Sequence, residues 1–235
     1  MKTIIANWKN HPETLEKAKE LFEFEVTEAI KYPNLKTVIC PPEQFLRPLA
    51  EINKKFIGAQ DVFWNLGGDG YGGKYALVGH SDRRRAGDTD EAVNQKLKIA
   101  LESGVTPVFL MGEKEKTDNR QVILQKQLTV GLATLSTSDV DKVLIVYEPV
   151  WAISTNPNAE PDTPEDTLKA MEIINTFLLK TYNLKPKTIL YGGSITEKNV
   201  ADFLKHQEIG GAVIGGASLR KEEFARILEI ASQIK

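Results

Sequence analysis

A glutamate directly follows a β-branched apolar run. Residues 143–147 show no polar alternation, which predicts a strand buried on both faces, as in parallel sheets covered by helices. Glu148 comes next, and Pro149 restricts it to extended conformations. Because catalytic side chains in parallel α/β folds project from the carboxyl ends of strands, we interpret Glu148 as a catalytic carboxylate able to move a proton, rather than a solvated loop residue.

Two further polar residues end predicted strands. Lys9 lies shortly after the run 3–6, and His80 lies shortly after the run 75–78. In isolation, a lysine near a terminus is usually a solvated charge and a histidine is usually structural. A functional role for His80 gains weight because Glu148 and Lys9 belong to the same predicted face, where a neutral imidazole could polarise substrate oxygens.

Glycine pairs follow the last two predicted strands. Gly192-Gly193 comes after residues 188–191 and Gly215-Gly216 comes after residues 211–214. Backbone amides in glycine-rich turns can approach phosphate oxygens closely. Either glycine pair alone is weak evidence for a phosphate site, because glycine pairs most often form turns. Two pairs at these positions predict the phosphate site that barrels place after strands seven and eight.

Short apolar runs alternate with amphipathic ones along the chain. This alternation predicts an α/β fold with a parallel sheet, and about eight strands in 235 residues favour a closed (β/α)8 barrel. No linker divides the chain, so we expect one domain over residues 1–235. The predicted strands are residues 3–6, 37–40, 56–59, 75–78, 106–111, 143–147, 188–191 and 211–214. The predicted helices are residues 14–31, 44–54, 90–103, 120–135, 164–182, 199–205 and 221–234, with Thr163 as an N-cap.

The connection between the third and fourth predicted strands does not follow this alternation. The fourteen residues from Asp61 to Lys74 include five glycines, at positions 67, 68, 70, 72 and 73. A crossover that contains a helix needs roughly ten to twelve residues, and each interior glycine costs about 1 kcal/mol of helix stability. We therefore predict that the third outer helix is shortened or missing.

Composition excludes several classes of protein. Thirty basic and 32 acidic residues leave a formal charge of −2, so no global field recruits nucleic acid or an acidic membrane. The single cysteine, Cys40, favours a reducing cytoplasm, and no apolar run approaches a membrane span. His11 and His206 lack a second ligand at metal spacing, so we expect neither metal nor cofactor. Residues 113–116 indicate a mixed-charge loop, and the basic run 83–85 indicates ion-paired or solvated side chains.

Five motifs, in order along the whole chain, resemble those of the triosephosphate isomerase family. They are Asn7-Trp8-Lys9, Gly79-His80-Ser81-Asp82-Arg83-Arg84, Tyr147-Glu148-Pro149-Val150-Trp151-Ala152-Ile153, Tyr191-Gly192-Gly193-Ser194 and Gly215-Gly216-Ala217-Ser218-Leu219. The resemblance implies a TIM barrel that interconverts dihydroxyacetone phosphate and D-glyceraldehyde 3-phosphate, in glycolysis and gluconeogenesis.

The resemblance also implies roles. Glu148 would be the base, His80 the neutral electrophile and Lys9 an electrostatic catalyst, because the reaction moves a proton between adjacent carbons and passes through an enediolate. The implied substrate contacts are Asn7, Lys9, Ser154, Ser194, Gly215 and Gly216. Residues 149–151 would be the hinge of a lid that closes over the substrate, with residues 152–156 as its tip.

Some positions depart from the family pattern. Asp82 replaces a glutamate that contacts the lysine, and its shorter side chain predicts that the contact with Lys9 is longer or broken. Ser154 and Asn156 replace lid glycines, which predicts a stiffer lid. In the family the loop after the third strand reaches a neighbouring subunit. Because residues 61–74 are short, we expect a homodimer with a reorganised interface, with a monomer as the alternative.

Two other functions remain open at this stage. One is another sugar-phosphate barrel, an epimerase or a lyase, in which Lys9 would form a Schiff base. The other is a non-catalytic sugar-phosphate-binding barrel that has lost turnover through Asp82 and the altered lid.

Overall fold

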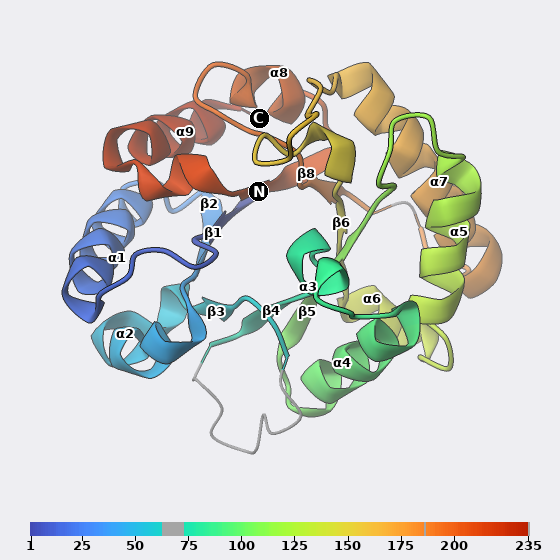
Figure 1. The fold of residues 1–235 in the computed structure, drawn as a ribbon, viewed down its shortest axis with the longest axis horizontal. Helices are drawn as coiled ribbons and strands as arrows, with labels where there is room; N and C mark the ends of the chain where they lie inside the picture. Colours follow the sequence, from blue (N-terminus) through green and yellow to red (C-terminus); the bar gives the residue numbers. More distant parts are fainter. Residues whose placement is uncertain (63–72, 186, 235) are drawn as a thin grey trace.

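The computed structural model describes residues 1–62, 73–185 and 187–234. Within them, one parallel sheet curls into a barrel that is ringed by helices (Figure 1). The strands are β1 (Lys2–Asn7), β2 (Leu35–Cys40), β3 (Gly58–Ala59), β4 (Tyr75–Val78), β5 (Thr106–Met111), β6 (Leu144–Tyr147), β7 (Ile189–Tyr191) and β8 (Ile209–Ile214). Their order is β2-β1-β8-β7-β6-β5-β4-β3, and a parallel bridge between Ile39 and Ile57 closes the ring.

Helices cover the outside of the barrel, except for α3 (Ser81–Arg85), which lies over the barrel mouth near the centre of the view (Figure 1). The other described helices are α1 (Leu15–Ile30), α2 (Leu46–Asn53), α4 (Asp90–Glu102), α5 (Arg120–Gly131), α6 (Thr137–Lys142), α7 (Pro164–Tyr182), α8 (Val200–Leu204) and α9 (Lys221–Gln233). None of the described helices is long and apolar enough to cross a membrane. The predicted (β/α)8 barrel is confirmed.

Both faces of the strands are buried because two apolar cores meet at the sheet. Along β5, Val108 and Leu110 pack with side chains inside the barrel, whereas Phe109 and Met111 pack against the outer helices. This arrangement accounts for strands without polar alternation. It also leaves the strand ends as the places where polar groups can face a cavity.

Local signals set the helix ends. The Thr163 side chain accepts a hydrogen bond from Asp166 N at 3.2 Å, and Pro164 occupies the first position of α7. The predicted N-cap is therefore present. Asn183 ends this helix in the left-handed conformation, with φ of 52°, which asparagine tolerates better than most residues.

The prediction for strand 56–59 was too long. β3 contains only Gly58–Ala59, because residues 54–56 form the short turn η2 (Lys54–Phe56). The Asn53 side chain accepts a hydrogen bond from Lys55 N and so starts a new turn after α2. Helices α3 and α6 were not predicted, since five or six residues are too few to show helical periodicity. The prediction of a shortened or missing third outer helix concerns residues 63–72, which lie outside the described residues.

Candidate active site

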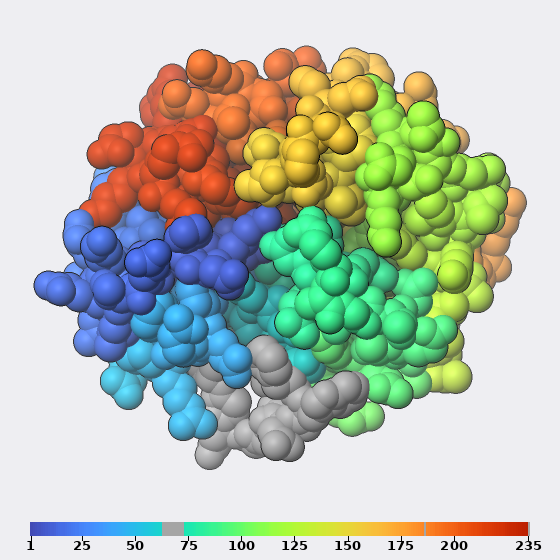
Figure 2. Space-filling model, viewed as in Figure 1, coloured from blue at the N-terminus to red at the C-terminus, as the bar shows by residue number. Residues whose placement is uncertain are grey.

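A cavity of about 150 Å³ opens at the carboxyl ends of the strands. Figure 2 shows this end of the barrel, where the amino-terminal segment, α3 and the lid crowd towards the centre. The residues predicted from the sequence to contact substrate all line the cavity: Asn7, Lys9, His80, Glu148, Ser154, Ser194, Gly215 and Gly216. Asp82 lies behind them and reaches the site through Lys9. The volume is well below the roughly 300–1,000 Å³ of pockets for drug-sized ligands, which suits a small substrate.

Glu148 leaves the end of β6 and is only 3% exposed. Its Oε2 accepts a hydrogen bond from Ser81 N at 2.9 Å, and its Oε1 lies 3.1 Å from His80 Nε2. Burial raises the pKa of Glu148, although the His80 side chain and the Ser81 amide act in the opposite direction. A carboxylate with a raised proton affinity is suited to take a proton from carbon.

Glycine at position 79 places His80. Gly79 has φ of +80°, and a Cβ there would lie 2.8 Å from Leu110 O, so a larger residue would be strained. His80 then caps α3, and its Nδ1 accepts a hydrogen bond from Asp82 N at 3.1 Å. Because Nδ1 accepts a hydrogen bond, a neutral His80 ring carries its proton on Nε2, which faces Glu148.

Lys9 adopts the left-handed conformation, with φ of 53°, which costs roughly 1–2 kcal/mol for a residue with a Cβ. Two neighbours hold it there: Asn7 Oδ1 accepts from Lys9 N at 3.1 Å, and Gln60 Nε2 donates to Lys9 O at 2.7 Å. Strain that the surroundings support in this way is frequent at functional sites.

The Lys9 ammonium forms an ion pair with Asp82. Lys9 Nζ lies 3.2 Å from Asp82 Oδ2. Of the two predicted outcomes, a longer or a broken contact, the broken contact was wrong, because α3 brings Asp82 close enough for the shorter side chain to reach. Burial favours the neutral carboxyl, but the electrostatic interactions with His80, Lys9 and Arg85, together with the hydrogen bond to Lys9, outweigh burial and lower the pKa of Asp82.

The glycine turns leave room for an anion. A Cβ at Gly215 or Gly216 would meet nothing within 4 Å, so the open space lies against the main chain. Across the cavity, Ser154 N donates to Ser194 Oγ at 2.7 Å, which ties the lid to the turn after β7. Main-chain amides around such a space are the usual donors to phosphate.

Comparison with known proteins identifies the family of this chain. A family model described as triosephosphate isomerase matches residues 2–231. The chain belongs to the triosephosphate isomerase family. Named triosephosphate isomerases from Dictyoglomus thermophilum and Dehalococcoides mccartyi are each 34% identical to it, covering 97% and 99% of this chain and 98% and 97% of the relatives. A third, from Caldanaerobacter subterraneus subsp. tengcongensis, is 35% identical and covers 96% of this chain and 97% of its own. The resemblance seen in the five motifs, and with it the isomerase class, is confirmed.

Within this member of the triosephosphate isomerase family, the predicted hinge, residues 149–151, contacts a buried residue that the sequence analysis missed. Glu113 is 1% exposed, although residues 113–116 were predicted only to form a mixed-charge loop. Its Oε1 accepts hydrogen bonds from Tyr147 OH at 2.7 Å, Arg120 Nε at 2.9 Å and Trp151 Nε1 at 3.0 Å. Trp151 is thereby fastened to the end of β6, next to Glu148.

Sequence reasoning also missed Ser81 and Gln60 as supports of the site. Ser81 holds the Glu148 carboxylate, and Gln60 holds the Lys9 carbonyl. Their positions, at a helix start and just after a strand, were the available signals. All three bases of the run 83–85 are ion-paired, to Asp61, Asp90 and Asp82 respectively.

Proposed function

We propose that this chain interconverts dihydroxyacetone phosphate and D-glyceraldehyde 3-phosphate with Glu148 as base and His80 as electrophile. The observation that carries the proposal is the 3.1 Å separation of Glu148 Oε1 and His80 Nε2 at the wall of one small cavity. A base and a neutral N–H donor at this spacing can act on one three-carbon substrate. The substrate enters between them and replaces their mutual contact with its own.

Glu148 takes a proton from the carbon beside the substrate carbonyl, and the electron pair of that C–H bond moves towards the carbonyl oxygen to form the enediolate. The Nε2–H of His80 donates to this oxygen and moves protons between the two substrate oxygens. Glu148 then returns its proton to the neighbouring carbon. Neither step requires a cofactor or a metal.

The proposed site also includes the positive charge of Lys9 and a set of main-chain amides that bind the substrate phosphate. Lys9 brings positive charge beside the enediolate and the phosphate, and Asn7, 3% exposed, is the proposed substrate contact at its side. The amides of Ser154, Ser194, Gly215 and Gly216 are the proposed phosphate donors. Since Ser154 N now donates to Ser194 Oγ, phosphate binding would exchange one acceptor for another without leaving the amide unsatisfied.

Beyond the chemistry, we propose one domain over residues 1–235, a cytoplasmic setting in glycolysis and gluconeogenesis, and a homodimer. The homodimer is supported by a groove of about 590 Å³ beside Lys9 and Asp82, also lined by Asn10, Gln44 and Gln60, which has room for a segment of a second copy. Light scattering at twice the chain mass of 26.2 kDa would support the dimer, and a single species at 26.2 kDa would refute it.

Deuterium exchange tests the proposed reaction. Incubation of dihydroxyacetone phosphate with the protein in D₂O should place deuterium at the carbon from which Glu148 takes the proton, as NMR would show, together with isomerised product. Addition of borohydride should leave the enzyme active. Inactivation with label on Lys9 would instead indicate Schiff-base lyase chemistry, and binding without either exchange or product would indicate a sugar-phosphate sensor.

A further inference from the structure

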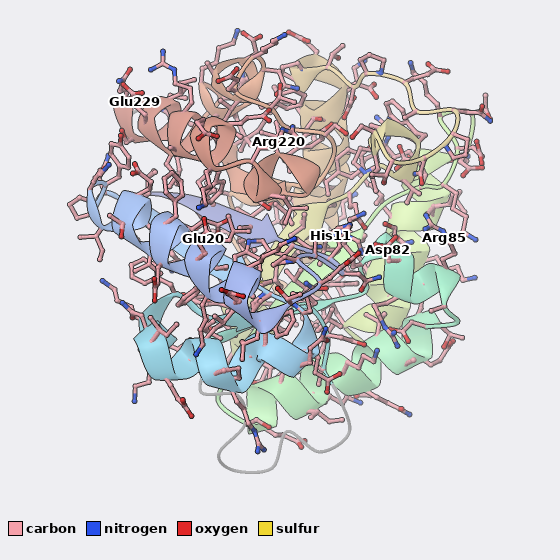
Figure 3. The ribbon with its side chains drawn as sticks, turned by 60° about the vertical axis from the view of Figure 1, so that its left-hand side comes forward. His11, Glu20, Asp82, Arg85, Arg220 and Glu229 are labelled. Carbon is pink, nitrogen blue, oxygen red and sulfur yellow. The ribbon has the colours of Figure 1, made fainter. Side chains whose placement is uncertain are left out.

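Arg85 connects the lid to the pair formed by Lys9 and Asp82. One guanidinium nitrogen, NH2, donates to Asn156 Oδ1 in the lid at 3.2 Å, while NH1 donates to Asp82 Oδ1 at 3.0 Å. The other oxygen of Asp82 pairs with Lys9 at 3.2 Å. Figure 3 labels Asp82 and Arg85 beside each other, and Figure 1 shows their helix, α3, over the barrel mouth. A continuous set of polar contacts therefore runs from the lid to a residue of the cavity wall.

The lid presents Asn156 to Arg85 in a fixed orientation. Asn156 N donates to Ile153 O at 2.9 Å, and the side-chain amide nitrogen donates to Val150 O within the same turn. Because the Nδ2 end is held by the main chain, the Oδ1 end must point outward, where Arg85 meets it. A glycine at position 156 would remove both side-chain contacts.

The chemistry of arginine suits this position. A planar guanidinium can donate to two acceptors at once in a fixed geometry, whereas a lysine ammonium acts as a compact charge on a flexible stem. Asp82 Oδ1 and Asn156 Oδ1 are the two acceptors here. Arg85 holds Oδ1 of Asp82, and this directs Oδ2 of Asp82 towards Lys9. The aspartate therefore keeps its ion pair with Lys9 although its side chain is shorter than that of glutamate.

We propose that Arg85 is a positioning residue that latches the lid and orients the Lys9–Asp82 pair. The inference rests on the proposed function, since it concerns how the same site holds its substrate. The lid has a second tie, from Ser154 N to Ser194 Oγ on the opposite side of the cavity. Arg85 thus holds the lid at Asn156, away from the cavity side that Ser154 and Ser194 line, so its loss would remove this tie and leave the one at Ser194 in place.

A loosened lid has a chemical signature besides weaker binding. When the enediolate phosphate is not held, its electron pair expels the phosphate: the bond between carbon and the bridging oxygen breaks, inorganic phosphate leaves with that bonding pair, and the remaining enol becomes methylglyoxal. Phosphate released per isomerisation therefore reports lid closure separately from overall folding.

The experiment compares Arg85→Ala, Asn156→Gly and the double variant with Arg226→Ala. Arg226 makes the same kind of contact as Arg85, an ion pair three residues away, to Glu229 on α9, which Figure 3 labels far from the mouth. We expect each single latch variant to raise KM and the phosphate released per turnover about three- to tenfold, the scale of one lost hydrogen bond at an exposed site, because solvent screens the contacts of Arg85. The double variant should be no worse than the more affected single variant, and Arg226→Ala should match the unmodified protein.

Arg85→Lys should have a KM and a phosphate release per turnover between those of the unmodified protein and Arg85→Ala. A lysine ammonium can keep one of the two contacts but cannot donate to both acceptors in the fixed geometry of a guanidinium. Arg85→Ala values equal to those of Arg226→Ala, or additive effects in the double variant, would overturn the inference. The affinity for phosphoglycolate provides a test independent of turnover: if the unmodified protein binds it but does not isomerise, the proposed function fails, while a three- to tenfold weaker affinity in Arg85→Ala and Asn156→Gly still supports the latch. Should Arg85→Ala unfold, Asn156→Gly carries the same expectation.

Discussion

His80 Nε2 lies 3.1 Å from Glu148 Oε1, while the other ring nitrogen of His80 accepts a hydrogen bond from Asp82 N at 3.1 Å. The main chain therefore sets which nitrogen carries the proton, and the carboxylate is already within reach of it. Ser81 N holds the second carboxylate oxygen at 2.9 Å. Groups fixed before the substrate arrives need little reorganisation during the reaction, which is the main advantage of such sites.

Replacing His80 tests the proton donor. His80→Gln should lower kcat about 10²- to 10⁴-fold, because an amide can donate a hydrogen bond but cannot move protons between the substrate oxygens. His206→Gln is the matched control, since His206 lies outside the cavity, and it should leave kcat unchanged. Steady-state kinetics would measure both variants, and a kcat for His80→Gln within threefold of the control would contradict the assigned role.

The pH dependence of kcat/KM tests the base. Burial raises the pKa of Glu148 above its ordinary value of 4.5, and only the ionised carboxylate can accept a proton. We expect kcat/KM to fall on the acid side with a midpoint above 4.5, because protonation through the raised pKa removes the base. A profile of kcat/KM between pH 4.5 and 8 with no loss of rate on its acid side would argue against Glu148 as the base.

A buried carboxyl away from the reacting centre affects stability. Glu25 is fully buried, its Oε1 accepts from Trp8 Nε1 at 2.9 Å, and its Oε2 has no partner among the described residues. Burial raises its pKa well above 4.5. The stability contributed by the neutral carboxyl is thus present in full below the unfolded-state pKa and is lost as the pH rises through the higher folded-state pKa.

The Glu25→Gln variant isolates the contribution of Glu25 ionisation to the pH dependence of the free energy of unfolding. The amide keeps an acceptor for Trp8 but does not ionise, so the variant should gain free energy of unfolding relative to the unmodified protein as the pH rises from about 4.5 to 8. Urea unfolding at both ends of that range would measure the difference. A constant difference between the two proteins across the range would show that Glu25 does not carry the pH dependence.

The glycine turn after β8 can be tested by adding one methyl group. A Cβ at Gly216 would meet no atom within 4 Å, so Gly216→Ala should unfold at the same temperature as the unmodified protein. If phosphate lies against this turn, the methyl group intrudes on it, and KM should rise roughly five- to 150-fold, the equivalent of about 1–3 kcal/mol. Unchanged KM in a normally folded variant would place phosphate elsewhere.

The strand ends were predictable because their signals are local. Glu148 and the two glycine pairs each follow an apolar run directly, and the barrel then brings them to one cavity. The short β3 was harder, because Asn53 starts a competing turn through a single side-chain hydrogen bond. The hydrophobic periodicity of the sequence does not predict a single side-chain hydrogen bond of this kind.

Supports that depend on two distant segments could not be predicted in this way. Gln60 meets the Lys9 carbonyl from 51 positions away, and Arg85 meets Asn156 from 71 positions away. Glu113 sits in a run of alternating charges, yet packing buries it beneath Trp151. These contacts arise only when the barrel closes, so the surrounding residue types give no warning of them.

The most direct test of the account is a coupled isomerase assay on D-glyceraldehyde 3-phosphate, with Glu148→Gln prepared from the same host in parallel. We expect turnover by the unmodified protein and a loss of about 10²- to 10⁴-fold in the variant, which should still bind phosphoglycolate. Equal turnover in both preparations, or binding without any turnover in the unmodified protein, would contradict it.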